Sequence, residues 1–202
     1  FQHKVILVLL LFMNVPFFLT GYMAKNLTET TILQEKESKL LAMAQVLNAR
    51  LDPGGYDAIL ERAGAQYASK EEKIQALNAA LKDITDEVGE SAPGLGAGYY
   101  SRDLDAILTY GPSASFGNNV GRAIPQEHPG RIVMRTNEPL VRSGTMVRGD
   151  ILNAMLPIER NGRVIGYIWA NELTTDITEQ MRTMSRNIFL VMLLCFLLTV
   201  GI

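Results

Sequence analysis

Seven polar side chains in the second half of the chain are candidates for binding chemistry. They are Tyr99, Tyr100, Arg102, His128, Arg131, Arg148 and Asp150. The planar fork of arginine suits bidentate capture of a carboxylate, and tyrosine supplies an apolar wall with a polar tip. These residue types predict a site for a small organic anion, held by Arg131 or Arg148. In the competing interpretation each arginine is a surface residue paired with Asp103, Glu127 or Asp150.

Catalysis and metal binding receive no comparable support from the sequence. We find no phosphate-binding glycine loop, no HExxH and no nucleophile elbow. The chain has two histidines, His3 and His128, so a metal site would need His128 together with carboxylates such as Asp103 or Asp105. A single histidine is more often structural. We therefore expect no metal, no haem or other cofactor, no nucleic-acid partner, and no catalytic site in this part of the chain.

Short strand-like runs must position the seven candidates. Ala97–Ser101 and Ala106–Tyr110 predict two strands joined by a polar turn, and His128–Arg135 predicts a short helix. The segment Leu140–Arg160 predicts a strand pair or one bent strand. Along "TMVRGDI" the period of two would place Met146, Arg148 and Asp150 on one face of a strand.

A closing hairpin follows. Asn161-Gly162 lies between two apolar-rich runs, and Asn-Gly is the strongest short-range signal for a two-residue turn of type I′. The final strand, Val164–Asn171, contains Gly166, which permits close packing or a bulge.

Helices are predicted before these strands. Lys25–Leu51 contains neither glycine nor proline and is rich in strong helix formers. A second and a third helix are expected at Tyr56–Tyr67 and Lys70–Val88, the third opened by a capping box between Ser69 and Glu72. A sheet of about five strands needs one face covered, and the long first helix is the natural cover.

Two uncharged apolar runs bracket this middle part. Val5–Met23 is close to the roughly 20 residues that cross a bilayer as a helix, and Asn187–Ile202 is shorter. We predict a transmembrane helix at residues 1–24, an extracytoplasmic domain at 25–186, and a second, truncated transmembrane helix at 187–202, which makes a two-pass protein of the cell membrane. The alternative for the first run is a cleavable signal peptide, whose apolar core would be shorter.

The hairpin "MLPIERNGRVIGYIWANEL" and the earlier "GYYSRDLDAILTYGP" resemble the sheet strands of Cache domains. These are PAS-like extracytoplasmic sensor modules of bacterial sensor histidine kinases and chemoreceptors. The resemblance covers Lys25 to Arg186. It implies an α+β fold, with a long N-terminal helix and short helices packed on an antiparallel sheet of about five strands. It also implies a ligand pocket on the sheet face that binds small organic molecules.

The functional hypothesis is the input region of a membrane two-component sensor histidine kinase. A ligand would displace the final strand, and the second transmembrane helix would carry that displacement to a kinase beyond Ile202 and on to a response regulator. The spacing of Leu33, Leu40 and Leu47 matches a heptad, which predicts a parallel homodimer through Lys25–Leu51 unless these leucines cover the sheet of their own chain. The alternatives are the same module on a chemoreceptor or diguanylate cyclase, and a membrane-anchored binding protein without signalling output.

Overall fold

The computed structural model describes residues 2–91 and 94–200, without the side chains of 2–11, 13–14 and 199–200, and divides into two compact units. One unit is Glu37–Thr174, and the other combines Phe1–Lys36 with Thr175–Ile202. The predicted domain limits at 24/25 and 186/187 fall inside continuous helices. They remain predictions, and much of the first predicted membrane span lies outside the described side chains.

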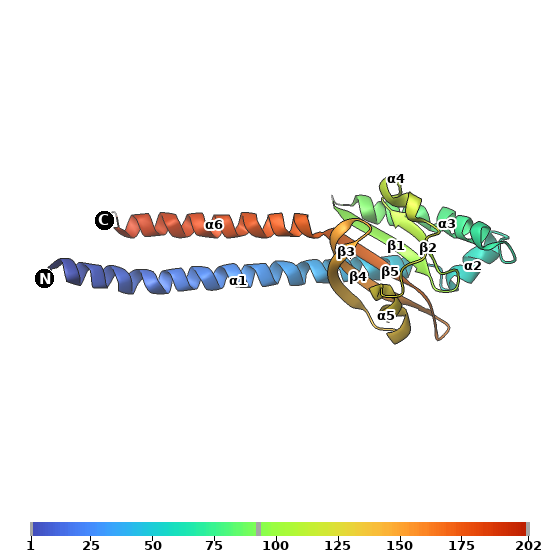
Figure 1. Ribbon diagram of the computed structural model, residues 1–202, viewed down its shortest axis with the longest axis horizontal. Helices are drawn as coiled ribbons and strands as arrows, with labels where there is room; N and C mark the ends of the chain where they lie inside the picture. The colour runs from blue at the N-terminus through green and yellow to red at the C-terminus, as the bar shows by residue number, and fades with distance from the viewer. Residues whose placement is uncertain (1, 92–93, 201–202) are drawn as a thin grey trace. The chain divides into compact units, whose positions relative to one another are not determined.

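An antiparallel sheet forms the centre of the Glu37–Thr174 unit (Figure 1). Its strands are β1 (Leu95–Ser101), β2 (Ala106–Gly111), β3 (Leu140–Met146), β4 (Gly149–Arg160) and β5 (Arg163–Leu173). They lie in the order β2-β1-β5-β4-β3, so the last strand in the sequence is the middle strand of the sheet. The expected five-stranded antiparallel sheet is confirmed, and the segment Leu140–Arg160 is a strand pair.

The β4–β5 hairpin has the predicted turn. Asn161 and Gly162 both adopt positive φ, 52° and 74°, as a type I′ turn requires. Gly166 combines close packing with an irregular register. A Cβ atom there would lie 1.9 Å from the carbonyl oxygen of Tyr100, and the β4–β5 register shifts between Ile158 and Glu159, next to the pair that Ile158 forms with Gly166.

Six helices and one 3₁₀ turn account for the other described elements. They are α1 (Gln2–Arg50), α2 (Gly55–Arg62), α3 (Lys70–Glu90), α4 (Ser113–Phe116), the 3₁₀ turn η1 (Gly117–Asn119), α5 (Pro129–Thr136) and α6 (Thr174–Val200). The capping box is present, because the Ser69 hydroxyl accepts from the Glu72 amide while the Glu72 carboxylate accepts from the Ser69 amide. The second helix ends earlier than predicted, where Gly64 turns the chain at φ 67°. The sequence patterns did not predict α4 or η1.

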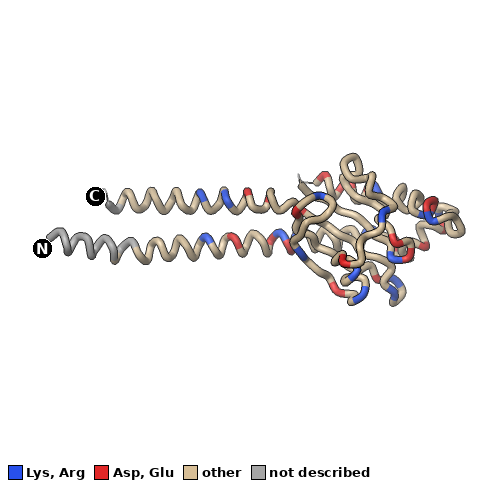
Figure 2. The backbone as a smooth tube through the Cα atoms, viewed as in Figure 1, with Lys and Arg blue, Asp and Glu red and all other residues tan. Residues whose placement is uncertain are grey.

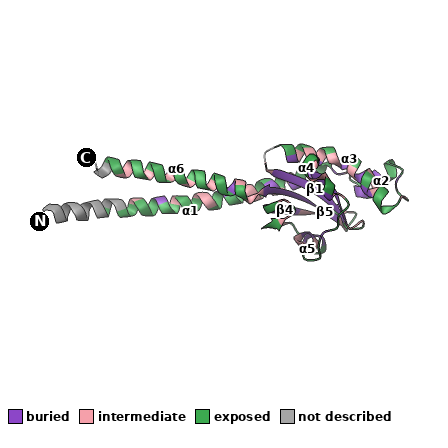
Figure 3. Ribbon diagram, turned by 45° about the horizontal axis from the view of Figure 1, so that its top comes forward, coloured by how far each residue is buried: buried purple, intermediate pink, exposed green. Residues whose placement is uncertain are grey.

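Three helices share the cover of one sheet face. α1 contributes Ala44 and Leu47 to the same apolar core that α2, α3 and the inner side of the sheet supply, and Leu51 joins this core just after α1 ends. α3 packs on β1 and β2. α1 is therefore one part of the cover. β1 is buried along its whole length, and β5 is buried from Gly166 to Glu172 (Figure 3).

The second unit contains α6 and the first part of α1. The two helices approach closely at Gly21, where a Cβ atom would meet the Met192 side chain, and the Ser185 hydroxyl donates to Glu29 (3.2 Å). The described charged side chains of α6 all precede Asn187 (Figure 2). Among the described residues, one helix is long and apolar enough to cross a membrane, at Thr174–Leu198.

Candidate functional site

A cavity of about 360 Å³ lies on the sheet face that α1, α2 and α3 leave uncovered. We call it the sheet-face cavity. It arises because β5 alternates, so Tyr167, Trp169 and Asn171 point away from the helices. The cavity is lined by Ile107, Tyr110, Asn119, Arg122, Ala123, Ile124, Pro125, His128, Thr145, Met146, Val147, Ile151, Asn153, Tyr167, Trp169 and Asn171.

Aromatic rings form much of the wall. The ring of Trp169 lies 5.6 Å from that of Tyr167 and 5.3 Å from that of Tyr110, and Tyr167 lies 5.3 Å from Tyr100. These separations are typical of interacting aromatic pairs. Burial raises the pKa of Tyr110 and Tyr167, so both phenols stay neutral at physiological pH. The wall suits the apolar body of a small ligand.

Two buried amides face each other across the strands beside this wall. Asn153 of β4 is paired in register with Asn171 of β5, and both are almost fully buried. The Asn171 side-chain oxygen accepts from Arg148 (2.6 Å). The Asn153 side-chain oxygen has no hydrogen-bond partner among the described residues. A buried acceptor left unsatisfied costs about 1–3 kcal/mol, so Asn153 is suited to receive a donor from a molecule in the cavity.

Two groups with basic character also line the cavity. Arg122 donates to the Asn119 side-chain oxygen (3.2 Å). His128 caps α5, since its Nδ1 accepts from the Gly130 amide (3.0 Å). Burial, and then the nearby Arg131 cation, lower the pKa of His128, so the imidazole is neutral at physiological pH and Arg122 supplies the positive charge.

Of the seven predicted residues, His128 alone is part of the cavity lining. Tyr100 and Arg131 lie beside it, in a network with Asp105. The Tyr100 hydroxyl donates to Asp105, Arg131 forms an ion pair with the same carboxylate (2.7 Å), and Arg131 also donates to the Ile124 carbonyl (2.7 Å). These contacts lower the pKa of Asp105, while burial, followed by the bond to Asp105, raises that of Tyr100 to about 12. Asp105 was considered from the sequence as a metal ligand but not as the ion-pair partner of Arg131.

The strand alternation predicted around Arg148 is wrong. Val147 and Arg148 form the β3–β4 turn, because Met146 pairs directly with Gly149 and Gly149 adopts φ 96°. From this turn the Arg148 guanidinium lies 4.8 Å above the ring of Phe116 and donates to Asn171. Arg148 therefore lies next to the cavity lining and contacts it through an amide.

The other three predicted residues lie elsewhere. Tyr99 points to the opposite face of the sheet, where its buried hydroxyl donates to the Leu47 carbonyl (2.6 Å). Arg102 is exposed after β1. Asp150 is exposed at the start of β4, where its carboxylate accepts from the Thr145 hydroxyl. The structure thus separates the adjacent tyrosines onto two faces.

Sequence reasoning missed most of the lining residues. They include Tyr110, Arg122, Asn153, Tyr167, Trp169 and Asn171. One signal was present in "YIWAN", where two aromatic residues and an amide recur with the period of two that marks one face of a strand. Among the described residues, no group of three or more histidine, cysteine or carboxylate side chains could hold a metal ion.

The fold and this cavity define a sensor domain of the Cache class. In agreement, the chain is similar in fold to the sensor domain of the V. cholerae histidine kinase DctB, with a TM-score of 0.59 and 12% identity over 81% of this chain and 58% of that one. It is also similar to the ligand-binding domain of the Campylobacter jejuni chemoreceptor Tlp3 in complex with 4-methylisoleucine, with a TM-score of 0.50 and 12% identity over 80% and 61%.

Residues 2–179 match the AtoS N-terminal domain family, and the chain belongs to that family. It is 49% identical over 191 residues to the signal transduction histidine-protein kinase AtoS of Escherichia coli (strain K12). That alignment covers 95% of this chain and 30% of the kinase.

Proposed function

We propose that this chain is the ligand-sensing input region of a membrane sensor histidine kinase. The 49% identity to such a kinase along nearly the whole chain carries the proposal and favours a kinase output over a chemoreceptor or a cyclase. A kinase of this class passes its signal to a response regulator, which would be the cytoplasmic partner. An anchored binding protein without output is less favoured for the same reason.

The ligand proposed for the sheet-face cavity is a small organic carboxylate. Arg122 supplies a cation that forms no ion pair among the described residues, and this charge suits a carboxylate. The Asn153 oxygen is an acceptor, so it would meet a donor elsewhere on the ligand and not the carboxylate. Aromatic side chains would hold a short apolar body. This proposal keeps the ligand class expected from the sequence and transfers the carboxylate contact from Arg131 or Arg148 to Arg122.

Strand β5 would pass the signal onward. It is the middle strand of the sheet, it lines the cavity through three side chains, and it ends at Leu173, where α6 begins with the next residue. A ligand that shifts β5 therefore acts on α6 without an intervening loop. We place α6 across the cell membrane, with the residue 25–186 domain outside it and a first crossing at residues 1–24.

Calorimetric titration of the detergent-solubilised chain with acetate, butyrate and hexanoate tests the ligand class, with butylamine as the cationic control. We expect butyrate or hexanoate to bind and Arg122→Gln to weaken that binding about 10- to 100-fold, the equivalent of one hydrogen bond to a charged group. Arg102→Gln, outside the cavity, is the matched control. The proposal fails if no carboxylate binds or if both variants bind like the wild type.

The homodimer through Lys25–Leu51 remains part of the proposal. Leu40 and Leu47 are fully buried within their own chain, whereas Leu33 is 39% exposed, so the first heptad position is the one open to a partner. Single cysteines at positions 29–39, in a Cys195→Ser background, should crosslink in membranes with a helical period. Uniform absence of crosslinks would exclude this dimer helix.

A further inference from the structure

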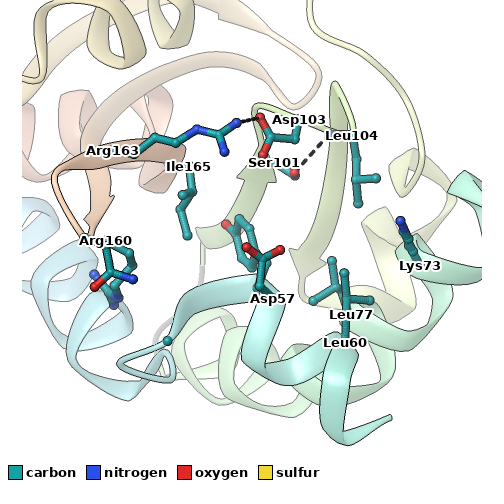
Figure 4. Close-up of a pocket in the computed structure, with 13 residues that line it drawn as sticks. Asp57, Leu60, Lys73, Leu77, Ser101, Asp103, Leu104, Arg160, Arg163 and Ile165 are labelled. Atoms are coloured by element: carbon teal, nitrogen blue, oxygen red, sulfur yellow. Dashed lines mark hydrogen bonds and ion pairs between the residues drawn. The ribbon is translucent and has the colours of Figure 1, made fainter. Parts of the chain in front are cut away.

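A second cavity, of about 380 Å³, lies where the β1–β2 and β4–β5 turns meet α2 and α3 (Figure 4). We call it the turn cavity. It shares no lining residue with the sheet-face cavity. Its apolar side chains are Tyr56, Leu60, Leu77, Leu104 and Ile165.

Two opposite charges line the turn cavity without neutralising each other. Asp57 comes from α2 and is exposed, and Lys73 comes from α3 and is half-buried. Neither forms an ion pair or hydrogen bond with any residue drawn in Figure 4. An ion pair between solvent-exposed side chains contributes at most about 1 kcal/mol, so leaving Asp57 and Lys73 unpaired costs the folded chain little.

The other charged groups of the cavity already have partners. Arg163 forms an ion pair with Asp103 at 2.6 Å. Arg160 donates to the backbone carbonyls of Asn48, Asp52 and Glu159, and so holds the hairpin turn to the end of α1. Asp57 and Lys73 are therefore the charges open to a ligand.

We infer that the turn cavity binds a small zwitterion with an apolar side chain, of the class of the neutral α-amino acids. Its ammonium group would meet Asp57, its carboxylate would meet Lys73, and its side chain would lie on Leu60, Leu77 and Leu104. A simple anion would pair with Lys73 but bring a negative charge towards Asp57. A simple amine would pair with Asp57 but bring a positive charge towards Lys73. Complementarity to both charges therefore selects a zwitterion.

A bound zwitterion would join parts of the chain that are distant in the sequence. Asp57 and Lys73 belong to the helical layer, while Asn161 and Ile165 belong to the β4–β5 hairpin. A ligand in the turn cavity would restrain the β4–β5 hairpin, and strand β5 of this hairpin also lines the sheet-face cavity. The turn cavity is thus placed to modulate the response to a ligand bound elsewhere.

Three related compounds test the charge requirement by calorimetric titration of the full chain in detergent. The titrations use the Arg122→Gln variant, in which carboxylate binding in the sheet-face cavity is weakened while the turn cavity, which does not contain Arg122, is unchanged. L-leucine carries both charges, 4-methylpentanoate lacks the ammonium group, and 3-methylbutylamine lacks the carboxylate. We expect L-leucine to bind at least about tenfold more tightly than either fragment, since each fragment loses one hydrogen-bonded charge contact. Absence of L-leucine binding, or binding no tighter than that of 4-methylpentanoate, overturns the inference.

Paired variants assign the contacts. Asp57→Asn and Lys73→Gln should each weaken L-leucine binding about tenfold or more, whereas the exposed neighbours on α3, Lys70→Gln and Glu71→Gln, should leave it unchanged. Arg122→Gln should also leave it unchanged. If L-leucine binding instead falls in Arg122→Gln and persists in Asp57→Asn, the zwitterion occupies the sheet-face cavity and the turn cavity is not its site.

Discussion

The two faces of the sheet are built from the same strands and differ in how they treat polar groups. On the helix-covered face, the Tyr99 hydroxyl donates to the Leu47 carbonyl and the Tyr56 hydroxyl to the Tyr100 carbonyl, so each buried phenol has a protein partner. On the other face, the Asn153 oxygen is buried without a partner among the described residues. The protein itself satisfies these two phenols on the helix-covered face, whereas the cavity face keeps a buried acceptor for a ligand.

This difference separates the residues that stabilise the domain from those that bind. Packing on the helix-covered face fixes the position of the middle strand, β5, and the same strand presents Tyr167, Trp169 and Asn171 to the cavity. A change on the first face should therefore alter the free energy of unfolding, and a change on the second should alter affinity.

The largest expected effect is on the helix-covered face. Leu47 is fully buried in the core, so Leu47→Ala should lower the free energy of unfolding by about 2–5 kcal/mol, as buried leucine truncations do. Urea unfolding followed by circular dichroism measures this change. Leu33→Ala, at a partly exposed position on the same helix, is the control and should cost much less. Equal losses would show that α1 does not contribute to the core as described.

A change in the backbone contact between β1 and β5 should affect both faces. Gly166→Ala would place a methyl group only 1.9 Å from the Tyr100 carbonyl oxygen. Such overpacking lowers the free energy of unfolding by about 1–3 kcal/mol or more. Gly144→Ala, on the edge strand β3 with nothing within 4 Å of the new methyl group, is the matched control. Thermal unfolding of the two variants should differ clearly, and indistinguishable melting temperatures would contradict the close approach.

The adjacent tyrosines allow a finer comparison. Tyr99→Phe removes a buried hydrogen bond and should lower the free energy of unfolding by about 0.5–1.5 kcal/mol. The lower end is expected, because the Leu47 carbonyl still accepts from the Leu51 amide (3.1 Å). Tyr100→Phe leaves Asp105 paired with Arg131, but it also removes the hydroxyl that accepts from the buried Ile124 amide (3.4 Å). Its effect on stability should therefore be at least as large as that of Tyr99→Phe, and affinity for the carboxylate should change more than in Tyr99→Phe. An equal change of affinity in the two variants would contradict this assignment of faces.

Local patterns predicted the elements of the fold well, because each depends on neighbouring residues. The Ser69–Glu72 capping box, the Asn161-Gly162 turn and the close packing at Gly166 all follow from short stretches of sequence. The binding residues were harder to predict because alternation shows which residues share a face but not which face the helices will cover. Tyr99 and Tyr100 were therefore grouped together, and Arg148 was assigned to a strand although Gly149 places it in a turn.

The smallest expected effect is a pH dependence from His128. Burial lowers the pKa of this histidine below its ordinary 6.5 in the folded state, and its Nδ1 must stay unprotonated to accept from the Gly130 amide. The unfolded chain therefore takes up a proton before the folded chain does as the pH falls. The stability contributed by neutral His128 is fully present above about pH 6.5 and is lost as the pH falls from there through the folded pKa.

Urea unfolding at a series of pH values from about 7 to 5 isolates this contribution. His128→Asn keeps a side chain that can cap α5 but does not titrate, so its stability should fall less than that of the wild type over this interval. The pKa values of Asp52, Asp86 and Asp105 are lowered from 3.8 in the folded state. Their contributions are present above that value and are lost at lower pH, outside the window. Parallel pH profiles for wild type and variant would mean that His128 does not titrate differently in the folded and unfolded chains, and that the wall of the sheet-face cavity is insensitive to pH.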